Sequence, residues 1–330
     1  MYNYRKLFLE ITLIKVAQIN QSFPYCYHFQ IENPALVESV KETGIVYPII
    51  LVFDKKYFVV DGHRRLIAAV SAGLKEVPAF VYDLKQIEAT FFMGLQVNLN
   101  SGDLTAIEKL KAYEIARERF SESGQEKIKQ LLGIDRLSYL ELIANSILKF
   151  PHSTQQYLHR QNFSMKALHQ LISYNLSEFS KWFTLADELN LKGSELLNIM
   201  EQVQDISLRD NQKPQTPLED KKLKEILESS RTPQQKVQTL KLFVFQKRFP
   251  LLNRMQTNIQ TIQKELEKLL GQDARLIWDR TLENPGAVLQ IYLKDEKRLS
   301  KILAKLQRPE IQGKIKKLLD GQNQLPEEDS

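Results

Sequence analysis

The N-terminal part of the chain carries short β-branched and aromatic runs separated by turn residues, a pattern typical of strands. Such runs occupy residues 9–16, 47–53, 57–60 and 77–82. Residues 54–56 join the second and third runs as a hairpin turn, and Pro78 places the last run at a sheet edge or near a strand start. Apolar residues at helical spacing predict two helices in this part. The first begins at Asn33-Pro34, and the second follows the third run and ends at Gly73. The pattern therefore predicts a compact α/β unit that ends near Asp83.

From residue 84 onward the hydrophobic positions repeat at helical spacing. Helices are expected over residues 84–98, 101–120, 125–132 and 136–150, and then at about 153–160, 164–173, 175–190 and 192–207. The third and fourth helices, joined by Gly133-Ile134-Asp135, form a helix–turn–helix-like pair. Its apolar stripe is predicted to be core and consists of Leu137, Leu140, Ile143, Ile147 and Leu148.

The C-terminal part begins after a polar, proline-containing segment, 210–217, which is the clearest linker in the sequence. A long polar helical region covers residues 233–270 and is interrupted at Pro250. Two strands follow at 274–280 and 287–293 around a turn at 283–286, an amphipathic helix over 294–306 closes the fold, and residues 326–330 are expected to be disordered.

These elements predict an α+β chain. A small mixed α/β N-terminal domain is followed by an all-helical middle domain with a helix–turn–helix, and then by a helical C-terminal region that ends in a β-hairpin and a helix. The expected boundaries are 1–98, 99–209 and 218–320, with a disordered tail at 321–330.

Composition and charge indicate the cellular compartment and the kind of partner that the protein has. The single cysteine, Cys26, leaves no internal disulfide and suits a reducing cytoplasm. No stretch approaches the ~18 continuous apolar residues of a membrane span, and the N-terminus lacks the apolar core of an export signal, so we expect a cytoplasmic protein with no membrane contact. Residues 211–330 hold 23 Lys and Arg against 16 Asp and Glu. A basic partner-binding surface is therefore expected mainly in the C-terminal third.

The strongest chemical signal lies in Asp61-Gly62-His63-Arg64-Arg65, between a predicted buried strand and a predicted helix. A helix start exposes unpaired backbone N–H groups at the positive end of the dipole, and glycine lets a ligand approach the backbone closely. The two arginines add forked donors that match phosphate geometry. The segment predicts a phosphate-binding corner, although a solvated helix start would share this pattern.

Four motifs, in this order, resemble the ParB family of chromosome- and plasmid-partition proteins. They are Gly44-Ile-Val-Tyr-Pro-Ile, Val60-Asp-Gly-His-Arg-Arg-Leu-Ile-Ala-Ala, Ala72-Gly-Leu-Lys-Glu-Val-Pro-Ala and Asn98-Leu-Asn-Ser-Gly-Asp-Leu-Thr-Ala-Ile-Glu. The resemblance covers roughly residues 9–172. It implies that the N-terminal domain has the ParB/sulfiredoxin fold.

The resemblance also implies a nucleoside-triphosphate pocket, with CTP as the family's ligand. Residues Gly62 to Arg65 would hold the phosphates, and Gly44 to Pro48, which include Tyr47, would border the base. Asp61 and Asn98 are also expected among the nucleotide-binding residues. In the family, nucleotide binding with magnesium closes a dimeric clamp around DNA that the helix–turn–helix has loaded. The implied partners are therefore DNA, a nucleoside triphosphate, a second copy of the chain and a ParA-like ATPase, and the implied enzyme activity is a weak CTPase of the ParB type.

The sequence departs from the family pattern at four positions. Tyr47 stands where the family has Gln, so the family's selectivity for the base need not hold in this chain. His63 replaces an acidic residue. Val97 replaces the Glu of a Glu-Asn pair, which leaves Asn98 as the candidate metal ligand, and a poor one because Mg²⁺ prefers charged oxygens. Ser101 replaces an Arg that contacts phosphate. We therefore expect triphosphate binding to survive more readily than hydrolysis.

Two residues of the corner have two interpretations each. His63 is either a neutral donor at the helix N-terminus or a proton donor near a phosphate. Asp61 either caps the following helix or serves as a base or metal ligand.

The second helix of the helix–turn–helix offers Arg136, Ser138, Asn145 and Lys149 for DNA contact. Its charge is sparse and Glu141 repels phosphates, so DNA binding through this helix alone would be weak, or the helix is structural. The basic C-terminal part could add phosphate contacts.

Three classes of function fit the sequence. A nucleotide-gated DNA-binding protein of the partition type accounts for the motifs, the helix–turn–helix and the C-terminal region together, and we favour it. A small-molecule kinase is the second class, since free-serine kinases share the fold and a similar Asp-Gly-His turn, although a long helical extension has no role there. A scaffold that has lost the nucleotide is the third. Sulfiredoxin activity is excluded because no cysteine lies at the turn.

The C-terminal hairpin also predicts an assembly. A lone two-stranded hairpin is marginal in water, and its apolar side chains, such as Trp278, Val288 and Tyr292, need a cover. Pairing with a second copy across a two-fold axis would supply it, as would packing onto the 175–270 helices of the same chain.

Overall fold

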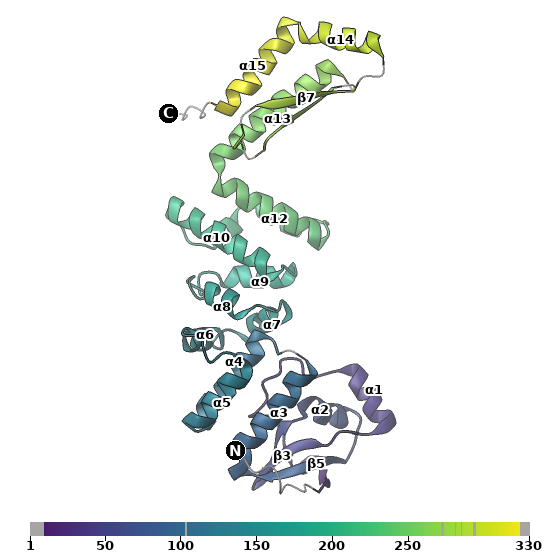
Figure 1. Ribbon diagram of the computed structural model, residues 1–330, viewed down its shortest axis with the longest axis vertical. Coiled ribbons are helices and arrows are strands. Elements are labelled where there is room, and N and C mark those ends of the chain that lie inside the picture. The colour runs from purple at the N-terminus through teal and green to yellow at the C-terminus, as the bar shows by residue number, and fades with distance from the viewer. Residues whose placement is uncertain are drawn as a thin grey trace. The chain divides into compact units, whose positions relative to one another are not determined.

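The computed structural model describes residues 10–102, 104–271, 274–280, 282–284, 286–292 and 295–323. The chain forms two compact units, Met1–Asn198 and Ile199–Ser330. A mixed sheet and a series of helices form the first unit, and helices with a β-hairpin form the second (Figure 1). The predicted α+β class is confirmed.

A five-stranded sheet organises the start of the first unit. Its strands are β1 (Thr12–Lys15), β2 (Ile19–Asn20), β3 (Ile49–Asp54), β4 (Lys56–Asp61) and β5 (Glu76–Asp83), in the order β1-β5-β3-β4-β2. The hairpin β3–β4 is antiparallel, as its tight turn requires, whereas β3 pairs with β5 in parallel through a helical crossover.

Helices cover both faces of this sheet. Helices α1 (Pro34–Thr43) and α2 (His63–Ser71) contribute Val40 and Leu66 to the same buried cluster as Leu51 and Val59 of the sheet. Helix α3 (Ile87–Ser101), which follows the short 3₁₀ turn Leu84–Gln86, packs against β3, β4 and β5 (Figure 1). The end of β4 and the start of α2 therefore lie at the border of a sheet with helices on both faces.

Pro78 lies near the start of its strand, which is one of the two places predicted for it, and not at a sheet edge. Strand β5 is not at the edge of the sheet, because β1 pairs on one side and β3 on the other. Pairing with β3 begins only at Ala79, whereas Pro78 lies opposite Leu13 of β1. A residue without an N–H is tolerated there because the strand has one neighbour at that point.

The remaining helices of the first unit confirm the predicted helical region, with shifted ends. They are α4 (Ala106–Arg119), α5 (Glu122–Leu132), α6 (Leu140–Ile147), α7 (His152–Arg160), α8 (Met165–Leu171) and α9 (Ser180–Glu188), followed by α10 (Gly193–Asp210). Thr105 and Glu108 form a capping box that starts α4.

The second helix of the helix–turn–helix is shorter than predicted. Gly133 ends α5 in the left-handed conformation, and successive turns, in which Leu137 N–H donates to Ile134 and Leu140 N–H to Leu137, delay the next helix until Leu140. The expected start at Arg136 was therefore wrong. In the predicted core stripe, Leu140, Ile143 and Ile147 of α6 are buried. Leu137 and Leu148, which flank this helix, are each half-buried.

The second unit contains the predicted long helical region, broken at Pro250 as expected. Its elements are the 3₁₀ turn Thr216–Glu219, α11 (Lys221–Glu228), α12 (Pro233–Arg248), α13 (Pro250–Leu270), β6 (Ala274–Trp278), β7 (Ala287–Ile291), α14 (Glu296–Leu306) and α15 (Pro309–Asn323). Strands β6 and β7 pair antiparallel, which confirms the predicted hairpin. None of the helices in the described part of the chain combines the length and apolar character needed to cross a lipid bilayer.

The end of the fold differs from the prediction, because α14 does not close it. Pro309 starts a further helix, α15, in which Ile311 and Leu318, seven residues apart, are buried against α13. Residues 321–323 belong to this helix and not to a tail. The predicted disordered segment 326–330 lies outside the described residues, as do residue 9 of the first predicted strand and residue 293 of the last.

Candidate functional site

The turn between β4 and α2 brings the predicted corner residues together. Gly62 is the N-cap of α2 with φ of 90°, and a Cβ on this residue would lie 2.8 Å from Cγ2 of Ile49. Only glycine fits this left-handed and crowded position. The backbone N–H groups of the first turn of α2 follow directly, and they lack intrahelical acceptors. The turn therefore presents the donors expected of an anion-binding helix start.

The predicted interpretation of Asp61 as the helix cap was wrong. Asp61 ends β4, the N-cap is Gly62, and no side chain caps the helix. The carboxylate is buried and accepts hydrogen bonds from Arg65 Nη2 at 2.8 Å and from Asn98 Nδ2 at 2.7 Å. Gly94 of α3 makes room for it, since a Cβ there would lie 3.0 Å from Cβ of Asp61.

The two arginines of the corner have different surroundings. Arg65 is half-buried and donates from Nη1 to the carbonyls of Tyr47 and Pro48, at 2.6 and 2.7 Å. It thereby fastens the 44–48 loop to α2. Arg64 is exposed, and within the described residues its hydrogen bond runs from Nε to the Gln30 carbonyl at 2.9 Å. The terminal nitrogens of Arg64 are thus the guanidinium donors that remain for a ligand.

The imidazole of His63 is enclosed in protein. Its side chain is 3% exposed and meets the ring of Phe23 edge-on, with the centroids 5.4 Å apart. Burial lowers the pKa of His63 to about 4, against the opposing influence of Asp61, so the ring is neutral at pH 7. Its Nε2 atom is buried without a hydrogen-bond partner among the described residues.

Exposed side chains lie on the loop and helix beside the corner. Tyr47 is 76% exposed on the loop that Arg65 fastens, and Val46 is similarly open. On α3, Val97 is exposed one residue before Asn98, whose amide nitrogen lies 2.9 Å from Tyr27 Oη and within reach of Asp61. Gly44, at the end of α1, has φ of 70° and open space around it.

Three residues important to this region were missed at the sequence level. Tyr27 holds Asn98, His28 Nδ1 lies 3.2 Å from Oε1 of Glu108, and Glu108 is 4% exposed. Burial alone would raise the pKa of Glu108, but hydrogen bonds from His28 and from the Thr105 N–H lower it to about 2. The polar-aromatic composition of residues 18–30 was the available signal.

The predicted DNA-contact residues are all exposed, but they do not lie on one helix. Arg136 and Ser138 are exposed in the turns before α6, Asn145 is on α6, and Lys149 is exposed just beyond its end. Asn145 Oδ1 accepts a hydrogen bond from Arg117 Nη1 at 2.8 Å. Two further side chains of α6 are exposed, the carboxylate of Glu141 and the apolar side chain of Leu142.

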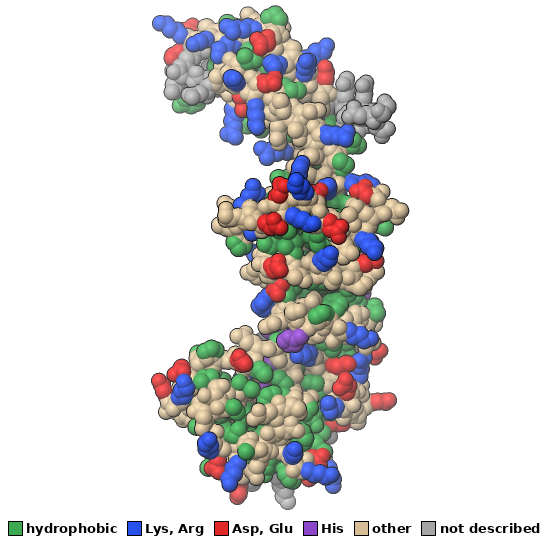
Figure 2. Space-filling model, turned by 180° about the vertical axis from the view of Figure 1, so that it is seen from behind, with side chains coloured by type: hydrophobic (Ala, Val, Ile, Leu, Met, Phe, Trp, Pro, Cys, Tyr) green, Lys and Arg blue, Asp and Glu red, His purple; other side chains and the backbone are tan. Residues whose placement is uncertain are grey.

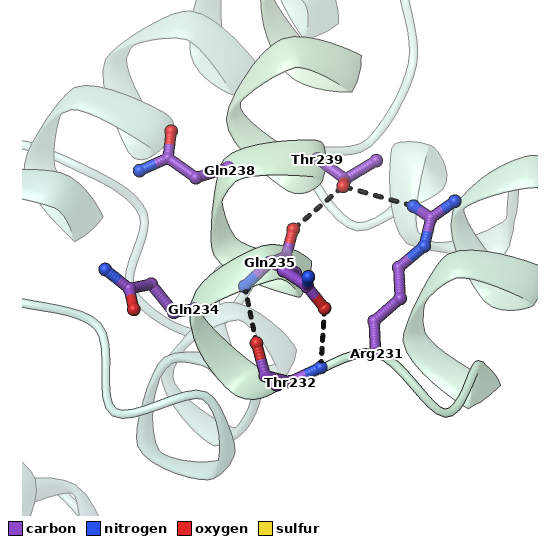
Figure 3. Close-up of a pocket in the computed structure, with 6 residues that line it drawn as sticks. All are labelled: Arg231, Thr232, Gln234, Gln235, Gln238 and Thr239. Carbon is purple, nitrogen blue, oxygen red and sulfur yellow. Dashed lines mark hydrogen bonds between the residues drawn. The ribbon is translucent and has the colours of Figure 1, made fainter.

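A separate hollow of about 590 Å³ lies at the start of α12 in the second unit (Figure 3). Its wall is formed by Arg231, Thr232, Gln234, Gln235, Gln238 and Thr239. The Thr232–Gln235 capping box and the hydrogen bond from Arg231 to Thr239 engage four of these six side chains internally (Figure 3). None of the predicted site residues lies there. Among the described residues, no cluster of three or more His, Cys, Asp and Glu side chains is arranged to hold a metal ion.

The chain is similar in sequence to proteins of known families. Residues 9–99 match the family model of the ParB N-terminal domain. The chain is 31% identical over 221 residues to Stage 0 sporulation protein J of Bacillus subtilis, covering 64% of this chain and 75% of that protein. It is 35% identical over 114 residues to the Chromosome-partitioning protein ParB of Myxococcus xanthus, covering 34% of this chain and 38% of that protein. Among solved structures, the chain is similar to the crystal structure of C-terminally truncated ParB from Caulobacter crescentus complexed to the centromeric parS site. The sequence identity is 24% and the TM-score is 0.32, and the match covers 57% of this chain and 97% of that chain.

The fold and site define a class of protein in which a mixed α/β domain with a strand–glycine–helix turn precedes a series of helices. The chain belongs to the ParB family, of which it is a divergent member. It spans less than half the length of the Myxococcus protein that it matches.

Proposed function

We propose that the protein is a nucleotide-gated DNA-binding protein of the ParB type that acts in chromosome or plasmid partition. The observation that carries this proposal is the turn from Asp61 to Arg65, where a glycine-started helix and a free guanidinium end meet. The turn lies in the same compact unit as the helix–turn–helix. A cytoplasmic location and a ParA-like ATPase partner remain predictions, as do the three domain boundaries.

The ligand is a nucleoside triphosphate, and the family resemblance favours CTP. The N–H groups of the first turn of α2 and the terminal nitrogens of Arg64 are donors suited to phosphate oxygens. The 44–48 loop, held by Arg65, borders the base, and the exposed ring of Tyr47 is available to stack on it.

The protein's own residues do not fit a bound Mg²⁺ ion well. Asn98 offers a single neutral amide oxygen, and each carboxylate oxygen of Asp61 accepts a hydrogen bond, one from Arg65 and one from Asn98. Val97 offers no oxygen in its side chain. Because phosphoryl transfer depends largely on positioned metal charge, we propose at most slow CTP hydrolysis.

The kinase alternative needs a base that is free to accept a proton. Asp61 is paired with Arg65 at 2.8 Å and is buried, so it has a structural partner in this state. This pairing favours the binding function over phosphate transfer to a small hydroxyl compound.

DNA contact is proposed for the outer surface of the helix–turn–helix, through Arg136, Ser138, Asn145 and Lys149. Exposed lysines in the second unit would add phosphate contacts that are independent of sequence. Lys and Arg side chains gather over the end of that unit that carries α14 and α15 (Figure 2). Exposed examples are Lys297, Lys301, Lys316 and Lys317.

We further propose that the chain forms a homodimer through its C-terminal hairpin. One face of the hairpin, with Leu276 and Trp278, packs into the buried cluster formed with α13 and α15. The opposite face keeps Ile277 and Val288 exposed. An apolar sheet face of this kind is suited to pairing with the same face of a second copy.

Nucleotide binding is tested by calorimetric titration of the purified protein with CTP, ATP, GTP and UTP. We expect CTP to bind and Arg64→Ala to weaken binding by about 10-fold or more, because a charge-assisted hydrogen bond is worth about 1.5–3 kcal/mol. Lys41→Ala, on the exposed face of α1, is the matched loss of a cation and should leave the affinity unchanged. Failure of every triphosphate to bind at millimolar concentration would favour the scaffold alternative.

A further inference from the structure

The exposed amide of Asn145 on α6 is held by a side chain of α4. Its Oδ1 atom accepts a hydrogen bond from Arg117 Nη1 at 2.8 Å. Because arginine carries only donors, the atom of the amide that faces Arg117 is the oxygen, and the amide nitrogen is turned away. The terminal torsion of asparagine has a broad, roughly two-fold preference. The contact with Arg117 therefore selects one of two amide orientations.

Arg117 is itself fixed by Glu114, which lies three residues earlier on α4. Arg117 Nη2 donates to Glu114 Oε1 at 2.7 Å, and both side chains are half-buried. A hydrogen bond between two charged groups is about twice as strong as one between neutral groups. Since one end of the guanidinium is tied to Glu114, its other end has a defined place beside α6. Glu114 and Arg117 together position the amide of Asn145.

The bond to Arg117 leaves most of the hydrogen-bonding capacity of the amide open. An amide oxygen accepts two hydrogen bonds and an amide nitrogen donates two. Arg117 uses one acceptor position, and the part of the chain that the structure describes provides no second partner. One acceptor and two donors remain for a ligand. The major-groove edge of adenine has the matching pattern, a donor at N6 and an acceptor at N7.

We propose that Arg117 is a positioning residue for DNA recognition, which holds the Asn145 amide ready to read an adenine in the major groove. The amide oxygen accepts from N6 of the base, and the amide nitrogen donates to N7. A guanine at the same place presents O6, an acceptor, to the amide oxygen, so it is disfavoured. This inference rests on the proposed DNA contact through Asn145, and it adds the base that is read and the residues that support the reading.

The charges around the amide favour base selection over general affinity. Arg117 is neutralised by Glu114, and Glu141 lies four residues before Asn145 on the same face of α6. Binding that is independent of sequence depends on cations that are free to meet phosphates. The Glu114–Arg117–Asn145 network therefore contributes to specificity and little to the affinity for DNA of mixed sequence.

The test variant is Glu114→Met/Arg117→Met, which removes both members of the ion pair. It leaves no unpaired charge in this half-buried place and keeps the net charge of the chain. The affinity for a mixed-sequence duplex should therefore be retained. The matched control is Glu126→Met/Lys129→Met, which removes an ion pair of the same i,i+3 spacing from α5.

The experiment is selection of bound duplexes from a library with a random central segment, followed by sequencing. We expect wild type to enrich a site with an adenine that Asn145→Ala no longer selects, and the test variant to lose preference at the same position. Anisotropy titrations then compare this site with one in which that A·T pair is replaced by G·C. Wild type should prefer the A·T site by about 5- to 150-fold, the range for a bidentate contact.

In the same titrations, the test variant should lower this preference by at least about 2-fold, whereas the control variant should keep it. The inference is overturned if the test variant keeps the wild-type preference, if Asn145→Ala changes no position of the site, or if the base at that position is not adenine. Enrichment of no sequence by a wild type that binds DNA would overturn it as well. Absence of DNA binding by wild type would remove the proposed function and the inference together.

Discussion

At the start of α2, Gly62 combines a left-handed backbone with contact against Ile49 of β3. We expect Gly62→Ala to destabilise the first unit by about 2–5 kcal/mol, since left-handed strain costs about 1–2 kcal/mol and overpacking about 1–3 kcal/mol. Urea unfolding measures this. In a Trp278→Phe background, Trp182 is the only tryptophan and lies buried in the first unit.

The control for this substitution is Gly133→Ala. Gly133 also has positive φ, 67°, but a Cβ there would meet nothing within 4 Å. It should cost only about 1–2 kcal/mol, the strain alone. Equal losses for the two variants would contradict the crowding at Gly62.

Glu108 predicts a dependence of stability on pH. Its folded pKa, about 2, is below the ordinary value of 4.5, so its contribution is fully present above pH 4.5 and is lost as the pH falls toward 2. In urea unfolding between pH 7 and pH 3, Glu108→Gln should flatten the loss of stability in acid relative to wild type. Parallel pH profiles for the two proteins would show that Glu108 is not held as the anion.

At this scale the sequence predicted the residues that act locally and missed those that act at a distance. Gly62, Arg64 and Arg65 could be found because strand, turn and helix signals adjoin within a few residues. Tyr27 and His28 could not, because their partners are 71 and 80 residues away along the chain. Such pairings depend on how the helical part docks, which no local pattern encodes.

The helices α3 and α5 are joined by one carboxylate. Glu88 of α3 accepts hydrogen bonds from Ser121 N at 2.7 Å and from Ser121 Oγ at 3.0 Å, at the positive end of the α5 dipole. We expect Glu88→Ala to reduce the free energy of unfolding of the first unit by about 1.5–3 kcal/mol, the range for hydrogen bonds to a charged group. Urea unfolding of this variant, followed by the fluorescence of Trp182 in the Trp278→Phe background, measures the loss.

Glu38→Ala serves as the control for Glu88, because its ion pair with Lys41 is exposed on α1 and is worth at most about 1 kcal/mol. A loss at Glu88 no larger than the loss at Glu38 would mean that this tie between α3 and α5 contributes little.

Most helices could be predicted from the sequence, but the start of α6 and the whole of α15 were not predicted. A hydrophobic stripe that includes Leu137 suggested a helix from Arg136, but turns after Gly133 use these residues before α6 begins. Helix α15 was missed although Pro309 and the helical spacing of Ile311, Ile315 and Leu318 were a signal for it in the sequence. Their burial depends on α13, a tertiary contact.

For the whole molecule, the hairpin face predicts the oligomeric state. We expect a dimer by light scattering at tens of micromolar, and we expect Val288→Lys, at a position 61% exposed, to give a monomer because the substitution buries a charge in the interface. Gln312→Lys is the control, since Gln312 is exposed on α15 and lies outside the hairpin. A monomeric wild type, or a dimeric Val288→Lys, would contradict the proposed interface.

The central claim is that nucleotide at the corner of α2 controls DNA binding. Its most direct test is fluorescence anisotropy of a labelled mixed-sequence DNA duplex, titrated with the protein at fixed salt, with and without saturating CTP. We predict that CTP changes the DNA affinity by at least about 5-fold, the lower range of allosteric coupling, and that Arg64→Ala removes this change. An identical DNA affinity with and without CTP, in protein shown to bind CTP, would contradict the account.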